Sequence, residues 1–405
     1  MENRRSFLLK TLGVACSMAA SPLITPVTFA SAPTDNRLVV IILRGAMDGL
    51  DVVRPVGDRN LGVHRPDIPN DGLPLTDFYA LHPKLDPLMP LWDAGDLAFA
   101  HAVSTPYRDK RSHFDGQDLL EAGYGDLKSY HEQPVISGWM NRLLSQMSNV
   151  HAETAFAVGT EDLILLKGDA PSSSWAPGRS LTLSEQGQNF LQRIYEHDPL
   201  FHTRAETAID LSNQVLAEMD MGDDMDMDAM MDANLSAARQ SSRARALAEF
   251  TAEQMLQSTR IAAFSIGGWD THRAQNRQIE GPLTQLSNAV TTLKDRLGAH
   301  WEATTVIGVT EFGRTVRMNG SAGTDHGTGG AMIMAGGAIK GGKVLGDWPG
   351  LRSRDLYQDR DLMPTADLRE YIALAIRDLF DVNETKLENV VFPSLRMSGI
   401  PTFVA

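Results

Sequence analysis

Several apolar segments of this 405-residue chain border carboxylate and imidazole side chains, and these side chains could bind a metal ion. The residues are Asp48, Asp270 with His272, Glu311, and Asp325 with His326. Carboxylate oxygens and imidazole nitrogens are the mixed ligand set that divalent transition metals use in proteins. The glycines on both sides of Asp325-His326 allow the backbone to come close to such an ion. The sequence therefore predicts a site for a divalent metal.

Four of the predicted ligands also have a purely structural explanation. Asp48 precedes Gly49, and Asp-Gly is an ordinary turn sequence. Asp270 and His272 could be a capping aspartate and a surface histidine. Glu311 could form only a buried ion pair with Arg314. The set taken together favours the metal site.

Ser112 is a candidate for a hydroxyl nucleophile, in the segment Arg111-Ser112-His113-Phe114-Asp115. It stands at the N-cap of a predicted helix, where the positive end of the helix stabilises an anion. The alternative is that Ser112 only caps the helix. His113 could be a base, a metal ligand or a packing residue. Arg314 could hold the anionic oxygens of a substrate with two parallel hydrogen bonds.

Alternating strands and helices are predicted to position these residues. The predicted strands are Leu38–Leu43, Leu97–Val103, Thr154–Val158, Ile261–Ile266, Thr304–Val309 and Ala331–Ala335. The predicted helices are Pro87–Ala94, Ser112–Ala122, Gly138–Ser148, Leu181–Ile194, Ala205–Met219, Ser236–Ser258, Gly281–Leu297 and Thr365–Leu379. The alternation favours a mostly parallel sheet with helices on both faces, whose strand carboxyl ends meet at one edge. We expect one domain, residues 33–405, because the predicted ligands span most of the chain.

The first 32 residues are predicted to be a twin-arginine signal peptide. Arg4-Arg5 precedes a mildly apolar stretch over residues 11–29, and Ala30 and Ala32 provide the small residues of a cleavage site. We expect the twin-arginine (Tat) export machinery as a partner and a periplasmic or secreted protein. No later segment is apolar for long enough to span a bilayer.

Charge and cysteine content exclude several classes of function. The net charge is −14, and cleavage would remove three basic residues and one acidic residue, which leaves −16. An acidic protein is a poor partner for nucleic acid or an anionic membrane. The single cysteine, Cys16, lies in the predicted signal peptide, so the mature chain has no disulfide or thiolate ligand. Lipid attachment at Cys16 is the alternative to its removal.

An acidic, methionine-rich segment is predicted at residues 218–234, with the sequence EMDMGDDMDMDAMMDAN. Thioethers suit copper(I) and carboxylates suit calcium, so a second metal site is one interpretation. A solvated acidic loop between two helices is the preferred one, because the segment lacks histidine and the spacing of an EF-hand.

Six short motifs resemble those of the DUF1501 family over nearly the whole mature chain. They are Arg-Gly-Ala-Met-Asp-Gly-Leu-Asp, Arg-Ser-His-Phe-Asp-Gly-Gln-Asp, Ser-Gly-Trp-Met-Asn-Arg, Gly-Gly-Trp-Asp-Thr-His, Thr-Glu-Phe-Gly-Arg-Thr and Thr-Asp-His-Gly-Thr-Gly-Gly. The family is similar to the alkaline phosphatase and sulfatase superfamily. The resemblance implies a three-layer α/β/α sandwich and a metal centre at the strand carboxyl ends, with zinc preferred and manganese or calcium as alternatives.

The resemblance also implies roles for individual residues. Asp48 matches the early metal aspartate and Ser112 the nucleophile. Asp270 with His272 and the later His326 match metal ligands. Glu311 stands where the superfamily has aspartate, and Phe312 replaces a histidine. We therefore expect an exported, metal-dependent hydrolase of small anionic phosphate or sulfate esters, with a non-catalytic metal-binding or interaction protein on the same fold as the alternative.

Overall fold

The computed structural model describes residues 34–108, 110–159, 163–175 and 228–405, and gives side chains for the last range from residue 241 onward. These residues belong to one compact unit, Ala32–Ala405. The predicted signal peptide, the predicted helices Leu181–Ile194 and Ala205–Met219, and residues 218–227 of the acidic segment lie outside the described residues.

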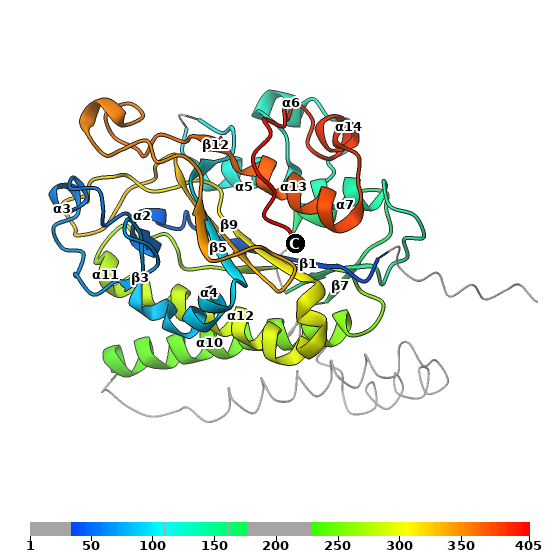
Figure 1. The fold of residues 1–405 in the computed structure, drawn as a ribbon, viewed down its shortest axis with the longest axis horizontal. Coiled ribbons are helices and arrows are strands. Elements are labelled where there is room, and N and C mark those ends of the chain that lie inside the picture. The colour runs from blue at the N-terminus through cyan, green and yellow to red at the C-terminus, as the bar shows by residue number, and fades with distance from the viewer. Residues whose placement is uncertain (1–33, 109, 160–162, 176–227) are drawn as a thin grey trace, which may run out of the picture. The chain divides into compact units, whose positions relative to one another are not determined.

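A central sheet of nine described strands is the main element of the fold (Figure 1). The strands are β1 (Arg37–Leu43), β5 (Leu97–Ser104), β6 (Ala155–Val158), β7 (Ser173–Trp175), β8 (Ile261–Ile266), β9 (Thr304–Val309), β10 (Gly330–Ala335), β11 (Lys343–Leu345) and β12 (Ala366–Asp367). Their order is β11-β5-β10-β9-β1-β8-β6-β7, and β12 pairs with β5. Strand β10 is antiparallel to both neighbours, and the other pairings described in this sheet are parallel.

Helices cover both faces of the sheet (Figure 1). They are α2 (Gly49–Val52), α3 (Leu61–His64), α4 (Met89–Ala94), α5 (His113–Ala122), α6 (Leu127–His131), α7 (Trp139–Leu144), α10 (Asp228–Met255), α11 (Gln275–Gln278), α12 (Glu280–Leu297), α13 (Leu368–Phe380) and α14 (Glu384–Lys386). The chain also contains short helical turns at Pro83–Leu88, Ile164–Leu166, Gly298–Ala303, Ser353–Asp355 and Leu387–Val391. A second, small antiparallel sheet consists of β2 (Val53–Arg54), β3 (Leu73–Pro74) and β4 (Ala80–Leu81).

Strand β1 shows how the sequence builds three layers. Alternate residues of a strand point to opposite faces of the sheet. Val40 belongs to the core shared with α7 and α13, whereas Ile41 belongs to the core shared with α10 and α12. All seven residues of β1 are buried, as expected for a parallel strand covered on both faces. The predicted three-layer α/β/α sandwich with a mostly parallel sheet is confirmed.

The predicted elements agree closely with the observed ones, and the main differences lie at the ends of helices. All six predicted strands are present, each within one residue at either end. Helix α7 ends at Leu144, four residues early, and α13 begins only at Leu368. Helix α10 begins at Asp228, so residues 228–234 of the predicted acidic loop are helical. Among the described residues, no helix combines the length and the apolarity needed to cross a membrane.

One edge of the sheet gathers the predicted functional residues. The carboxyl ends of β1, β8, β9 and β5 lie there, because these strands run in the same direction. The reversed strand β10 starts at that edge, so the loop before it meets the loops that follow the other strands. This reversal brings Asp325 and His326 to the same edge as Asp270 and Glu311.

Candidate metal centre

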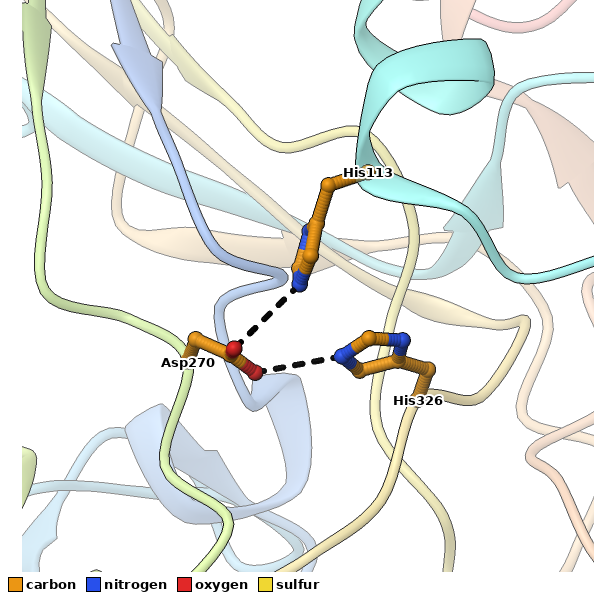
Figure 2. Close-up of side chains that lie close together, drawn as sticks. All are labelled: His113, Asp270 and His326. Atoms are coloured by element: carbon orange, nitrogen blue, oxygen red, sulfur yellow. Dashed lines mark hydrogen bonds and ion pairs between the residues drawn. The ribbon is translucent and has the colours of Figure 1, made fainter.

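Three imidazole rings and one carboxylate converge at this edge of the sheet. His113 Nε2 lies 3.4 Å from Asp270 Oδ2, and His326 Nε2 lies 3.1 Å from Asp270 Oδ1 (Figure 2). His272 Nε2 approaches the same Oδ1 at 3.0 Å. The four side chains come from the start of α5, the loop after β8 and the loop before β10. His113, Asp270 and His326 together form a group that can hold a metal ion.

Glu311 fixes the ring of His113. Its Oε1 lies 2.6 Å from His113 Nδ1 and also accepts the backbone N–H of Gly45. A carboxylate can only accept, so Nδ1 carries the proton and Nε2 of the neutral ring has a free lone pair. His113 Nε2 is buried and makes no hydrogen bond within the described structure. A carboxylate that orients a histidine in this way is the usual support of a metal-binding imidazole.

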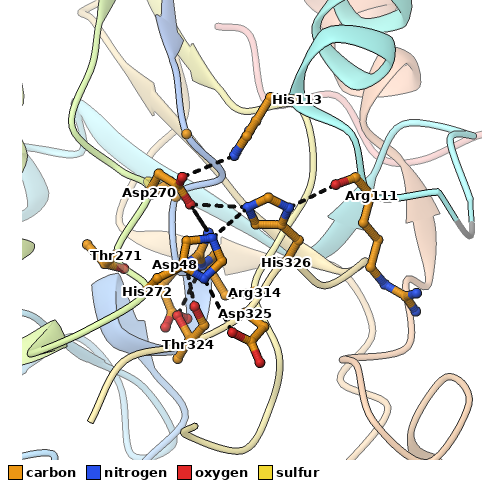
Figure 3. A network of polar contacts seen from close by, with 12 residues as sticks. Asp48, Arg111, His113, Asp270, Thr271, His272, Arg314, Thr324, Asp325 and His326 are labelled. Atoms are coloured by element: carbon orange, nitrogen blue, oxygen red, sulfur yellow. Dashed lines mark hydrogen bonds and ion pairs between the residues drawn. The ribbon is translucent and has the colours of Figure 1, made fainter. Parts of the chain in front are cut away.

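The other two histidines are oriented in the same manner (Figure 3). His326 Nδ1 lies 2.8 Å from the backbone carbonyl oxygen of Arg111, which can only accept. His272 Nδ1 lies 3.3 Å from Asp325 Oδ1, whose other partner is the Asn319 amide. His326 therefore turns an unprotonated Nε2 toward Asp270 when it is neutral. His272 has a carboxylate oxygen at each ring nitrogen, so both nitrogens of this ring face an acceptor.

The centre thus joins one carboxylate with three imidazole nitrogens, and those of His113 and His326 are unprotonated in the neutral rings. The Nε2 atoms of His272 and His326 are only 2.9 Å apart, a distance that suits a hydrogen bond when one of them carries a proton and a shared cation when neither does. Ligands at 2.0–2.1 Å from a tetrahedral ion are separated from one another by about 3.3–3.4 Å. The separations of 2.9 to 3.4 Å given above lie close to that spacing. The residues present therefore fit a divalent metal.

Arg314 holds Asp270 in place. Its Nη1 donates to Asp270 Oδ1 at 2.7 Å, and its Nε donates to Thr324 Oγ1 at 3.0 Å. The Thr324 carbonyl oxygen accepts from Nη2. The guanidinium is fully buried, whereas Asp270 is 44% exposed. Arg314 therefore holds a predicted metal ligand, and its guanidinium donates to acceptors within the protein.

The pKa shifts at the centre follow from burial and these contacts. The Glu311 hydrogen bond raises the pKa of His113, against the opposing effect of burial. Burial lowers the pKa of His326. Burial opposes the charge of Asp270, but hydrogen bonding and charge from Arg314 outweigh it and lower the pKa of that carboxyl. Asp270 and His326 thus favour the deprotonated forms that bind metal, whereas at His113 a metal competes with a proton.

Two glycines allow the loops of the centre to touch. Gly45 has φ +116°, and a Cβ on it would lie 2.6 Å from the backbone nitrogen of Asp270. A Cβ on Gly323 would lie 2.1 Å from the carbonyl carbon of His272. Side chains at either position would force the ligand-bearing loops apart.

Asp48 lies beside the centre but has protein partners for both of its oxygens. Oδ2 bonds to Arg65 Nη1 at 2.8 Å and to Gln275 Nε2 at 2.6 Å, and Oδ1 accepts from the N–H of Leu50. The Arg65 ion pair is fully buried. Gln275 also accepts from the hydroxyls of Thr271 and Thr324, which links Asp48 to the loops of the centre. Asp48 is placed as a structural support.

Glu311 and Asp325 likewise contact histidines, as described above, and do not themselves face the convergence point.

Ser112 caps α5: its Oγ accepts from the N–H of Asp115 at 3.5 Å, and its own N–H donates to the Tyr107 hydroxyl. The next residue, His113, is the one whose side chain reaches the centre. Sequence reasoning missed Gln275 and Arg65, which stand in no pattern that indicates them.

A family comparison identifies the chain. The family model described as "Protein of unknown function (DUF1501)" matches residues 98–391. The chain belongs to the DUF1501 family. The matched span contains the four converging side chains of this DUF1501 protein. No curated protein sequence matches it.

Several solved structures resemble this DUF1501 protein at low identity. Ps i-CgsB in complex with k-i-k-neocarrahexaose is 10% identical with a TM-score of 0.40, covering 88% of this chain and 75% of that chain. A protein in the alkaline phosphatase superfamily from Vibrio parahaemolyticus is 14% identical (TM-score 0.30, 78% and 64%). The C-terminal periplasmic domain of EcEptC from Escherichia coli is 11% identical (TM-score 0.37, 89% and 87%).

Proposed function

We propose that this DUF1501 protein is a metal-dependent hydrolase of phosphate or sulfate esters that acts outside the cytoplasm. The observation that carries the proposal is the convergence of three imidazole Nε2 atoms on Asp270, while the Nδ1 atom of each ring contacts a separate acceptor. Such a group of nitrogen and oxygen atoms suits the binding of a cation.

His113, Asp270 and His326 would hold the metal, with His272 as a fourth ligand or a neighbouring acid–base group. A divalent cation in this position supplies Lewis-acid stabilisation of the negative charge that develops on an ester during cleavage. Zinc suits the nitrogen-rich ligand set best, with manganese or calcium as alternatives. His272 is 44% exposed, so when its ring is protonated it can turn away from the ion and give a proton to a leaving group.

A single cation fits better than a pair. The Phe312 ring is buried and lies 5.2 Å, centroid to centroid, from the rings of both His113 and His326. It occupies the neighbouring space with an apolar surface and offers no ligand. We therefore propose a one-metal centre, in which Arg314, Glu311 and Asp325 orient the ligands and Asp48 supports the loops beneath them.

The proposal also includes export from the cytoplasm and a group that attacks the ester. Residues 1–32 would be removed as a twin-arginine signal peptide, which places the mature protein in the periplasm or outside the cell. Ser112 is the candidate nucleophile because it directly precedes His113 and its capping hydrogen bond is long. A water molecule would attack if Ser112 serves only as a cap.

The test is release of p-nitrophenol by the purified protein from phosphate monoester, phosphate diester and sulfate ester substrates, with zinc, manganese or calcium added or removed by chelation. Asp270→Asn and His326→Gln should each lower metal-dependent turnover by about 100-fold or more. The matched control is His300→Gln, an exposed histidine just before β9 at the opposite edge of the sheet. Metal-loaded protein that turns over no substrate would reject the hydrolase. Activity that survives Ser112→Ala would assign the attack to water.

A non-catalytic metal-binding protein is the second candidate. Its support is that Arg314, the predicted substrate clamp, is buried against Asp270 and Thr324, and that Ser112 caps a helix. That protein would bind metal in the same centre, lose binding in Asp270→Asn, and cleave none of the esters.

A further inference from the structure

Asp361 is a fully buried carboxylate that joins the two loops bearing histidine ligands. Its Oδ2 accepts from Arg111 Nε at 3.2 Å and Nη2 at 3.0 Å, and from Thr328 Oγ1 at 2.8 Å. Arg111 stands two residues before His113, and Thr328 stands two residues after His326. One carboxylate therefore ties the start of α5 to the loop before β10.

Arg111 needs this anchor because its backbone is in an unfavourable conformation. Its φ is +53°, in the left-handed region that residues with a Cβ rarely adopt. Such a conformation persists only where the surroundings hold it. It also has a specific result, because the carbonyl oxygen of Arg111 is the acceptor for His326 Nδ1. The side chain of Arg111 is held by Asp361, and its backbone orients a metal ligand.

The residues on either side of Asp361 strengthen the same connection. Arg360 Nη1 donates to Asp361 Oδ1 and to the backbone carbonyl of His326, both at 2.9 Å. The N–H of Gly329 donates to the carbonyl of Leu362 at 3.0 Å. Segment 360–362 therefore lies along the loop that carries His326 and contacts it through three hydrogen bonds, counting the one from Thr328.

We infer that Asp361 is a positioning residue of the metal centre, although it lies outside the ligand set. It fixes the direction of His326 Nε2 relative to His113 Nε2 by holding Arg111 and Thr328 together. The inference rests on the metal centre of the proposed function, but it does not depend on ester hydrolysis. Losing a group that hydrogen-bonds directly to a metal ligand typically changes metal affinity by about 10–100-fold, and Asp361 holds the residue whose carbonyl makes such a bond to His326.

The experiment measures metal binding by the purified full chain. Zinc affinity is obtained by competition with a chromogenic chelator, and the visible absorption of the cobalt(II) form reports the coordination geometry. In Asp361→Asn, zinc should bind about 10–100-fold more weakly, and the cobalt bands should change in position and intensity. The matched control is Asp96→Asn, an aspartate at the amino edge of the sheet that bonds to Trp301 and Lys294. It should keep the wild-type affinity and cobalt spectrum.

Each outcome decides the question. A folded Asp361→Asn with wild-type zinc affinity and cobalt spectrum overturns the inference and leaves the metal centre intact. Wild-type protein that binds neither metal refutes the centre, and the inference with it. If Asp361→Asn does not fold, Arg111→Gln and Thr328→Val take its place, because each removes one of the two contacts and keeps the carboxylate. Weaker zinc binding by both supports the inference, and unchanged binding by both overturns it.

Discussion

Replacing Arg314 with lysine separates a positioning role from a substrate-binding role. The sequence predicted that Arg314 holds substrate oxygens, but its guanidinium is fully buried and donates to Asp270 and Thr324. Lysine keeps the charge and loses the planar fork that serves several acceptors at fixed angles. Arg314→Lys should therefore lower stability and metal affinity, with no specific effect on substrate affinity.

The size of the stability loss follows from the contacts. A lysine can still pair with Asp270, and because that carboxylate is 44% exposed, the ion pair contributes only about 1 kcal/mol or less. The carbonyl and the hydroxyl of Thr324 lose their donor, and Thr324 is fully buried. A buried acceptor left without a donor costs about 1–3 kcal/mol, and the hydroxyl keeps its bond to Gln275. We expect Arg314→Lys to lower the free energy of unfolding by about 2–4 kcal/mol.

Urea denaturation of metal-free protein measures this change as a shift of the midpoint at constant slope. Arg317→Lys is the matched control, because Arg317 is 47% exposed and donates only to surface groups of the described structure. It should alter the free energy of unfolding by less than about 0.5 kcal/mol. The reasoning is refuted if Arg314→Lys has wild-type stability while the KM for an ester substrate rises steeply, since that result would place Arg314 on the substrate.

Two further predictions concern pH and metal. Burial lowers the pKa of His101 from 6.5 to about 4, so between these pH values the unfolded chain binds more protons and stability rises with pH. The contribution of neutral His101 to the free energy of unfolding is complete above about pH 6.5 and falls by about 2–3 kcal/mol toward pH 4. His101→Gln should therefore reduce the difference between the urea midpoints measured at pH 7.5 and pH 4.5. An unchanged difference would contradict the prediction. Zinc at 100 times its Kd should add about 2.7 kcal/mol of stability, measured as a rise in Tm that chelator reverses and Asp270→Asn abolishes. A wild-type Tm that does not respond to zinc, manganese or calcium would argue against the centre.

The strands that position the centre could be predicted because they are buried on both faces. Such strands appear in the sequence as continuous apolar runs, and Ile261–Ile266 and Thr304–Val309 have the predicted bounds. In a parallel sheet, the polar residues that follow these strands lie at the edge formed by the strand carboxyl ends. The positions of Asp270 and Glu311 at this edge could therefore be predicted, and so could that of His326, which stands in the loop before a strand.

The roles within that neighbourhood could not be predicted, because they depend on partners far away in the sequence. The role of Asp48 is decided by its hydrogen bonds to Arg65 and Gln275, which belong to other segments of the chain. Whether Ser112 or His113 faces the centre is decided by the rotation of α5 about its axis. Asp361 carries no local pattern, and it becomes significant only because Arg111 and Thr328 meet there.

The reversal of β10 has a consequence for how the protein could diversify or be engineered. Strands β9 and β10 are adjacent and antiparallel, so residues 310–329 form a hairpin connection whose two ends are held side by side. A connection of this kind can gain or lose residues at its tip without repacking a strand. The tip at 317–322 is largely exposed, whereas Glu311, Arg314 and His326 lie nearer the base. Asn319 donates to Asp325 Oδ1 and to the backbone carbonyl of His272, so a peptide inserted at the exposed Gly320 would report on the metal centre only if it left these two bonds in place.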